Sequence, residues 1–162
     1  MQRSFIKEIK TGQEVLLKGW CHELRIMSKM AFILLRDSSG VVQCIVKNEK
    51  ILKEISSLTL ESVIEIKGKV NKADVKNELA RKDAEVEVES LIVLAKAEKL
   101  PIQVNEKAVS AELPSRLDNR SLDVRKPKVM AIFKIQSVIA NSFREFFANK
   151  NFIEIQTPAI IG

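Results

Sequence analysis

The chain has 162 residues, of which 46% are hydrophobic and 30% are charged. This length suffices for one well-packed domain, or for a small domain plus part of another, and it excludes two ordinary enzyme domains. The composition predicts a buried core and excludes a disordered tail or a collagen-like chain. No apolar run approaches the ~20 residues needed to cross a bilayer, and the first residues lack a signal peptide's apolar stretch. We therefore expect a soluble cytoplasmic protein with no membrane contact.

Basic residues outnumber acidic ones by 27 to 21, which gives the chain a net charge of +6. Such a balance suits a polyanionic partner without demanding one. Residues 1–100 carry 18 Lys and Arg against 15 Asp and Glu, and residues 101–162 carry 9 against 6. Because no basic tail or block stands out, a nucleic acid would have to be bound by individually placed contacts on a mixed surface.

Short runs of alternating apolar and polar residues predict five strands in the first hundred residues, at 15–25, 31–37, 41–47, 62–70 and 85–94. Residues 37–40 have the composition of a hairpin turn, in which we expect Gly40 to supply a positive φ. Asn48 is a suitable cap for a short helix over residues 48–58. Three strands, a helix and two further strands follow one another in the order of an OB-fold, a five-stranded barrel that binds oligonucleotides.

The pattern changes in the second part of the chain. The polar residues after Pro101 predict an interdomain linker, and apolar residues at helical spacing then predict a helix over residues 128–148. Residues 152–158 alternate like a strand that Pro158 ends. One helix and one strand cannot bury their apolar faces alone, so they indicate the start of a larger domain or an arm that packs on a partner. We therefore divide the chain into a barrel domain (1–104), a linker (105–127) and an incomplete domain (128–162).

Candidates for catalysis are scarce. The five glycines are widely separated and form no phosphate-binding loop. Cys21, Cys44 and the single histidine, His22, do not form a zinc or disulfide pattern, so we expect two buried thiols and no metal site. Glu85, Glu87 and Glu89 alternate along one strand, which is more typical of a solvated face than of a paired-carboxylate site. The sequence predicts no catalytic residue in this chain.

Binding features are more informative. An OB-fold holds single-stranded bases by stacking them on aromatic side chains, while polar groups read the base edges. Phe32 begins the second predicted strand and Gln43 lies in the third, so an aromatic platform and an amide could share one face. Spacing alone does not exclude that Phe32 packs in the core or that Gln43 is an ordinary surface amide.

Three blocks of sequence resemble one known family. Residues 19–25, 31–37 and 41–43 (GWCHELR, AFILLRD and VVQ) resemble the anticodon-binding OB-fold of aspartyl-tRNA synthetases, particularly of the archaeal type. Residues 116–125 (RLDNRSLDVR) resemble the beginning of that family's catalytic domain. Residues 143–147 and 152–158 resemble motif 1 of class II synthetases, the helix and strand that build the dimer interface. The resemblance implies a mainly β chain, an OB-fold barrel with one short helix, followed by a linker and the start of an α+β catalytic domain.

The resemblance also implies roles for individual residues in binding a tRNA anticodon. Phe32 would stack on the middle base, and Gln43 would form hydrogen bonds with that uridine. Glu85 would accept from the amino group of the last base, a cytosine, and Arg25 would contact a base or the backbone. His22 occupies a position where relatives that charge only the aspartate tRNA differ from nondiscriminating relatives that also charge the asparagine tRNA, and a histidine there favours the nondiscriminating type.

The resemblance implies further that the parent protein is an aspartate–tRNA ligase that activates aspartate with ATP and Mg²⁺ and transfers it to tRNA. Motifs 2 and 3, which hold these cofactors, would lie beyond Gly162. We therefore expect a truncated piece that binds neither cofactor and is inactive alone. Its expected partners are the aspartate tRNA, the asparagine tRNA for the nondiscriminating type, and a second copy of the parent, through Phe143, Phe147 and Pro158 of motif 1.

Two alternatives from other classes remain open. The chain could be a general single-strand-binding OB module, which tolerates any sequence and depends steeply on salt. It could also be a non-catalytic, dimerising paralogue that has lost tRNA binding. Asparaginyl and lysyl relatives share the fold, and residues 116–125 favour the aspartyl family over them.

Overall fold

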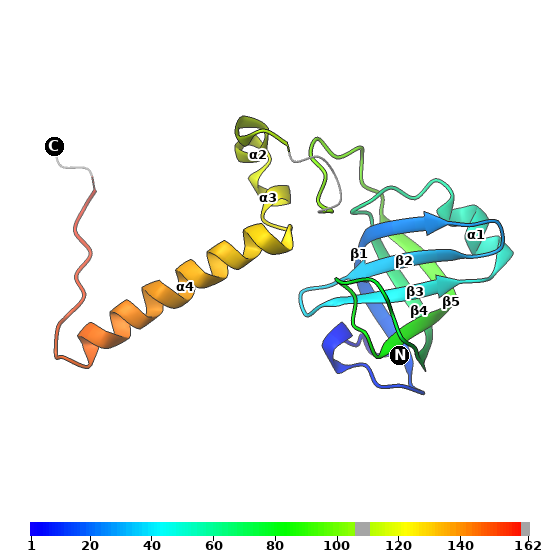
Figure 1. Ribbon diagram of the computed structural model, residues 1–162, viewed down its shortest axis with the longest axis horizontal. Helices are drawn as coiled ribbons and strands as arrows, with labels where there is room; N and C mark the ends of the chain where they lie inside the picture. The colour runs from blue at the N-terminus through cyan, green and yellow to red at the C-terminus, as the bar shows by residue number, and fades with distance from the viewer. Residues whose placement is uncertain (106–110, 160–162) are drawn as a thin grey trace. The chain divides into compact units, whose positions relative to one another are not determined.

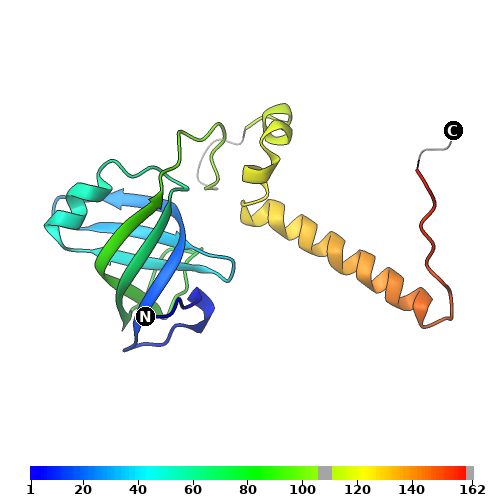
Figure 2. The ribbon, with the colours of Figure 1, turned by 180° about the vertical axis from the view of Figure 1, so that it is seen from behind.

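Five strands close into a barrel in the order β1-β2-β3-β5-β4, with β4 also pairing with β1 (Figure 1). All neighbouring strands are antiparallel except β3 and β5, which run parallel. Viewed from behind, β4 lies between β1 and β5, with which it pairs on either side (Figure 2). The predicted OB-fold is confirmed. The strands are β1 (Glu14–Ile26), β2 (Ala31–Arg36), β3 (Val41–Val46), β4 (Val63–Lys72) and β5 (Ala84–Ala95).

The computed structural model describes residues 1–105 and 111–159. These residues form two compact units, which divide after Pro101. The first unit contains the barrel, and the second contains α2 (Leu113–Asp118), α3 (Arg120–Asp123) and α4 (Pro127–Ala148). No helix in the described part is long and apolar enough to cross a membrane.

The barrel core follows from the alternation of side chains along each strand. In β3, Val42, Cys44 and Val46 are fully buried, while the residues between them are half-buried on the outside. Cys21 lies in the same core, and both thiols are free. Burial raises the pKa of both thiols, that of Cys21 to about 12, so they pack as small apolar side chains.

A short helix, α1 (Glu49–Ile55), connects β3 to β4. The side chain of Asn48 caps it by accepting from the backbone N–H of Lys50 at 2.9 Å. Ile51 and Ile55 are buried in the barrel core. The helix ends three residues before the predicted end at Leu58.

The turn between β2 and β3 is stabilised differently from the prediction. Gly40 does not have a positive φ; among the glycines of the described part, only Gly12 does. Instead the buried Asp37 organises the turn. Its Oδ1 accepts from the N–H groups of Ser39 and Gly40 at 2.7 and 3.0 Å, and its Oδ2 accepts from the N–H of Ile6 at 2.9 Å. The hydrogen bonds to this one carboxylate thus stabilise the turn without a positive φ. The bond from Ile6 also fixes the 3-10 turn η1 (Ile6–Glu8) against it.

Two features of the second unit differ from expectation. The segment predicted as a linker, 105–127, contains α2 and α3. The strand predicted at 152–158 is wrong, because these residues are extended but unpaired. A strand needs a hydrogen-bonding neighbour, and the described part of this unit contains no strand that could pair with it. The predicted helix at 128–148 is present as α4.

Candidate nucleic-acid interface

Two rows of side chains cross the outside of the barrel over β1, β2, β3 and β5. The strand register aligns the first row as Arg25, Phe32, Ile45 and Glu87. It aligns the second row as Glu23, Leu34, Gln43 and Glu85. The alternate residues of these strands fill the core, so both rows point outward. We call these two rows the outer face.

Phe32 lies half-exposed on the outer face, and its neighbours Ala31 and Ile33 are fully buried in the core. Arg25, directly opposite on β1, is exposed. An aromatic ring beside a guanidinium offers a base both a stacking surface and a cation. The outward position places Phe32 away from the core.

Gln43 and Glu85 are 42 residues apart in sequence but adjacent in the parallel pairing of β3 with β5. The side-chain amide Nε2 of Gln43 donates to Oε2 of Glu85 at 3.1 Å. This hydrogen bond orients the amide so that its oxygen and a second N–H remain for a ligand. The pair therefore presents a donor and acceptors side by side, which is what reading a base edge requires.

Glu87 is held by partners that the sequence analysis did not identify. Lys47 Nζ lies 2.9 Å from its Oε1, and Asn71 donates to its Oε2 at 3.1 Å. Mainly through the Lys47 hydrogen bond, the pKa of Glu87 lies below its usual range, so the carboxylate stays ionised. Glu89 pairs with Lys67 at 3.8 Å. Glu87 and Glu89 thus form solvated ion pairs. Lys47 places a positive charge beside Glu87, at one end of the first row of the outer face.

The loop between β4 and β5 covers part of the outer face. Val75 and Ala80 pack on Leu34, which is only 4% exposed although it points outward. Arg81 fixes this loop by donating to the carbonyls of Ile6 and Ile9 at 3.2 and 3.0 Å. The guanidinium also pairs with Asp83 and lowers the pKa of that carboxyl to about 2.

His22 does not lie on the outer face. It sits at a β-bulge between Cys21 and Glu23, and its side chain is 2% exposed. Its Nδ1 accepts from Arg36 Nη1 at 2.8 Å, since a guanidinium only donates. Arg36 also pairs with the buried Glu61 at 2.7 Å. His22 therefore does not share the outer face with Arg25, Phe32, Gln43 and Glu85, the other residues that the resemblance implies in anticodon binding.

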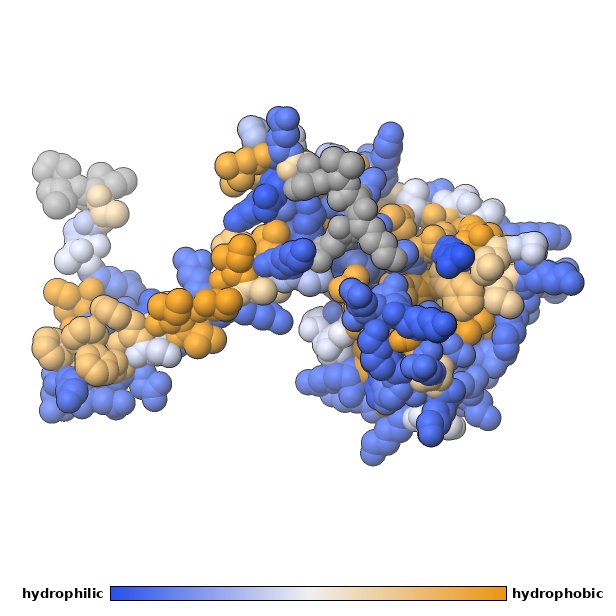
Figure 3. Space-filling model, in the orientation of Figure 1, coloured by the Kyte–Doolittle hydropathy of each residue, from blue (hydrophilic) through white to orange (hydrophobic). Residues whose placement is uncertain are grey.

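In the second unit, α4 carries a long exposed apolar surface (Figure 3). The ring of Phe147 lies 4.8 Å from that of Phe143 and 5.3 Å from that of Phe152, and Arg144 bonds Glu154 at 3.1 Å. Pro158 is exposed in the extended segment. The large exposed apolar residues here are Met130, Ile132, Ile135, Val138, Ile139, Phe143, Phe146, Phe152, Ile153 and Ile155.

Within residues 1–105 and 111–159, no three His, Cys, Asp or Glu side chains are grouped as a metal site. Asp123, which lies close to three charged groups, is enclosed by basic side chains, which are not metal ligands.

Comparison with known proteins agrees with this geometry. The family model for OB-fold nucleic acid binding domains matches residues 15–94, and that for tRNA synthetases class II (D, K and N) matches residues 112–162. The chain thus combines a match to a nucleic-acid-binding OB-fold with a match to a segment of class II tRNA synthetases.

Over most of its length, the chain is similar to archaeal aspartate–tRNA(Asp/Asn) ligases. It is 45% identical to that of Methanococcus maripaludis over 156 residues, which cover 93% of this chain and 34% of the relative. It is 42% identical to that of Methanocaldococcus jannaschii over 162 residues, which cover 97% of this chain and 36% of the relative. The chain spans about a third of the length of the curated relatives it matches.

The solved structures that match the chain include aspartyl- and asparaginyl-tRNA synthetases. An aspartyl-tRNA synthetase from Entamoeba histolytica matches with a TM-score of 0.84 and 27% identity, over 97% of this chain and 39% of that one. An asparaginyl-tRNA synthetase from Pyrococcus horikoshii, complexed with asparaginyl-adenylate, matches with a TM-score of 0.80 and 30% identity, over 98% and 37%. The resemblance seen in the sequence to aspartyl-tRNA synthetases is thus confirmed.

Proposed function

We propose that the barrel reads the anticodon of the aspartate tRNA as part of an aspartate–tRNA ligase. The observation that carries this proposal is the outer face, where Phe32 lies half-exposed beside the hydrogen-bonded pair of Gln43 and Glu85. The similarity to ligases named for both Asp and Asn tRNAs supports an enzyme of the nondiscriminating type. The parent would act in the cytoplasm.

In this proposal each side chain of the outer face has one task. Phe32 stacks on the middle anticodon base, and Gln43 forms hydrogen bonds with the edge of that uridine. Glu85 accepts from the amino group of the last base, a cytosine, because an ionised carboxylate can only accept. Arg25, exposed opposite Phe32, contacts a base or the adjacent phosphate.

Glu85→Gln tests the reading of the last base. The variant keeps the shape of the side chain but gains a donor, so it should lose preference for cytosine over uracil at that position. We expect the free-energy difference between the two tRNAs to fall by about 1–3 kcal/mol. The measurement is a filter-binding titration with both tRNAs, and Glu89→Gln, on the same strand, is the matched control. An unchanged preference in Glu85→Gln would show that this carboxylate does not read the base.

The chemistry of the parent would be activation of aspartate with ATP, followed by transfer to tRNA. Class II synthetases use ATP and Mg²⁺ for this reaction, and those cofactors would be held outside the residues described above. The contribution of the described residues is binding: the barrel selects the tRNA, and the helical unit joins two copies.

We also propose that α4 and the segment after it form a homodimer interface through Phe143, Phe147 and Pro158. The exposed apolar surface of α4 supports this, because monomeric proteins rarely leave so continuous a patch in water. Replacing the exposed Phe143 by Asp should shift the chain to a monomer in size-exclusion chromatography. A chain that remains monomeric at all concentrations, with or without the change, would refute the interface.

A further inference from the structure

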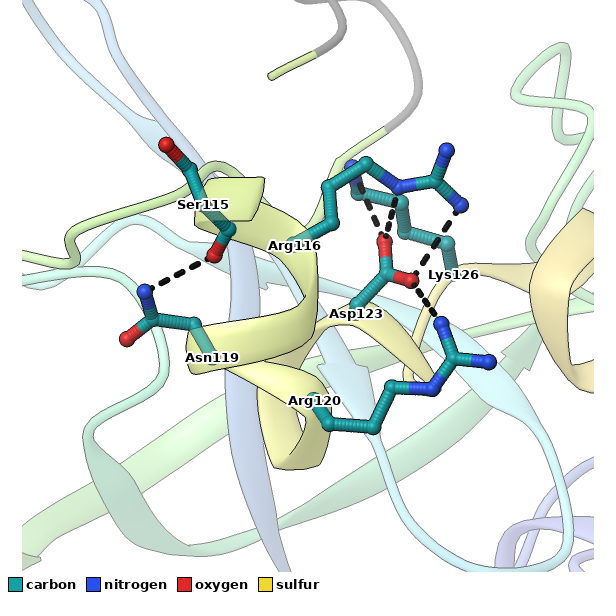
Figure 4. Close-up of polar contacts among 6 residues, drawn as sticks. All are labelled: Ser115, Arg116, Asn119, Arg120, Asp123 and Lys126. Carbon is teal, nitrogen blue, oxygen red and sulfur yellow. Dashed lines mark hydrogen bonds and ion pairs between the residues drawn. The ribbon is translucent and has the colours of Figure 1, made fainter. Parts of the chain in front are cut away.

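Three cationic side chains converge on one buried carboxylate where α2, α3 and the start of α4 come together (Figure 4). Asp123 is fully buried and accepts from Arg116 Nε and Nη2 at 2.9 and 3.2 Å. It also accepts from Arg120 Nη1 at 2.8 Å, and Lys126 Nζ lies 3.6 Å from its Oδ1. We call these four residues the Asp123 cluster. One negative charge faces three positive charges, so the cluster carries an excess of +2.

The cationic side chains of the Asp123 cluster carry more hydrogen-bond donors than the carboxylate of Asp123 can accept. A guanidinium carries five N–H donors and an ammonium three, whereas one carboxylate oxygen accepts only about two bonds. Both oxygens of Asp123 are already occupied. Arg120 is 42% exposed and Arg116 is 27% exposed, so their remaining donors can reach a ligand in solution.

The donors are also held in place. The guanidinium of Arg120 lies 4.8 Å from the ring centroid of Phe133 on α4, which fixes it from one side. Arg116 donates two hydrogen bonds to Asp123, and this bidentate geometry leaves the guanidinium little rotational freedom. The hydrogen bond from Arg116 lowers the pKa of Asp123, so the carboxylate stays ionised and keeps the arginines in position at neutral pH.

A rigid, partly exposed pair of guanidinium groups with excess positive charge suits an oxyanion with several oxygens, and phosphate matches the arginine fork best. Besides the cluster itself, residues 116–128 hold Arg125 and Lys128 against Asp118, so positive charge continues along the chain at the C-terminal end of the cluster. This continuity favours a row of phosphates over a single one.

We propose that the Asp123 cluster is a phosphate-binding site for the sugar–phosphate backbone of the tRNA. The inference depends on the proposed function for the identity of the RNA, but the site would act on any RNA backbone. Because a phosphate contact carries no sequence information, the cluster adds affinity without adding specificity.

The test measures binding of the 162-residue chain to the aspartate tRNA between 50 and 200 mM salt. Arg116→Gln and Arg120→Gln should each weaken binding and reduce the slope of log affinity against log salt by about 1, the effect of one lost phosphate contact. Arg120→Lys, which keeps the charge, should retain the wild-type slope. Lys53→Gln, on α1, removes one positive charge elsewhere and should leave the slope unchanged.

Phe133→Leu distinguishes a role of the cluster in RNA binding from a role in holding the helices together, because it removes the ring beside Arg120 without changing any charge. We expect this variant to lower thermal stability and to keep the salt slope. If Phe133→Leu and Arg120→Gln lower the slope equally, the cluster acts only by holding the helices, and the proposal is wrong. The proposal is also overturned if Arg120→Gln weakens ATP binding and leaves the slope for RNA unchanged, since the phosphate would then come from a free nucleotide.

The same titrations with an anticodon-replaced tRNA distinguish this inference from the proposed function. The cluster variants should weaken both tRNAs by the same factor. If the barrel proves not to read the anticodon, the wild-type chain binds both tRNAs equally, and the slope change still reports the cluster.

Discussion

Replacing Phe32 by alanine is expected to weaken binding of the aspartate tRNA by about 1–3 kcal/mol, or roughly 5- to 150-fold. The ring lies half-exposed on the outer face, so its removal takes away a stacking surface and leaves no cavity in the core. The unfolding midpoint of the barrel should therefore change little. Fluorescence anisotropy with a labelled anticodon stem-loop measures the affinity, and urea unfolding checks the fold.

Two matched variants make the result of Phe32→Ala specific. Phe32→Tyr keeps an aromatic ring and should retain most of the affinity. Phe5→Ala removes another aromatic side chain of the first unit, 36% exposed and in contact with Arg3, and should have no effect on RNA binding. If Phe32→Ala binds as tightly as Phe5→Ala while both fold normally, no base stacks on Phe32.

Gly68→Ala is expected to lower the free energy of unfolding by about 3 kcal/mol, a large loss for one methyl group. A Cβ at this position would lie 2.1 Å from the carbonyl oxygen of Glu87 and 3.0 Å from its carbonyl carbon. Both atoms belong to the backbone of β5, at an irregularity in the pairing of β4 with β5. Relief of the clash requires the two strands to separate, which opens the barrel.

Urea unfolding, followed by the fluorescence of the single tryptophan, Trp20, measures this loss. Gly40→Ala is the control, because its Cβ would approach only Ile6 Cγ2, at 3.4 Å, and its φ is not positive. We expect that variant to unfold close to the wild-type midpoint. Equal midpoints for the two alanine variants would mean that β4 and β5 are not packed as closely as described. Since β5 also carries Glu85, the partly unfolded Gly68→Ala chain should lose tRNA binding as well.

The resemblance to aspartyl-tRNA synthetases implied the binding roles of Phe32, Gln43 and Glu85. The alternation of apolar and polar residues was enough to predict the barrel, but it left open whether Phe32 packs in the core. It could not predict that Gln43 bonds Glu85, because the parallel pairing of β3 with β5 joins segments far apart in sequence. The ion pair of Lys47 with Glu87 was missed for the same reason.

Other differences arise from local geometry that a pattern does not contain. The residues of β1 alternate between buried and partly exposed as far as Cys21. At the bulge that follows, the side chain of His22 is also buried, and it contacts Arg36. Gly40 in the turn led us to expect a positive φ, but the turn is stabilised instead by hydrogen bonds to the carboxylate of Asp37. The Asp123 cluster was not visible in the charge balance, because acidic residues are interleaved with the basic ones in sequence and only the helices bring the cations together.

The most direct test of anticodon reading compares two tRNAs on the unmodified 162-residue chain. One is the aspartate tRNA, and the other is the same tRNA with its three anticodon bases replaced, both titrated at one fixed salt concentration. Base-edge contacts of the kind described contribute about 1–3 kcal/mol each, so the native anticodon should bind at least roughly tenfold more tightly. Equal affinity for the two tRNAs would contradict the proposal and identify the barrel as a binder of RNA without sequence preference.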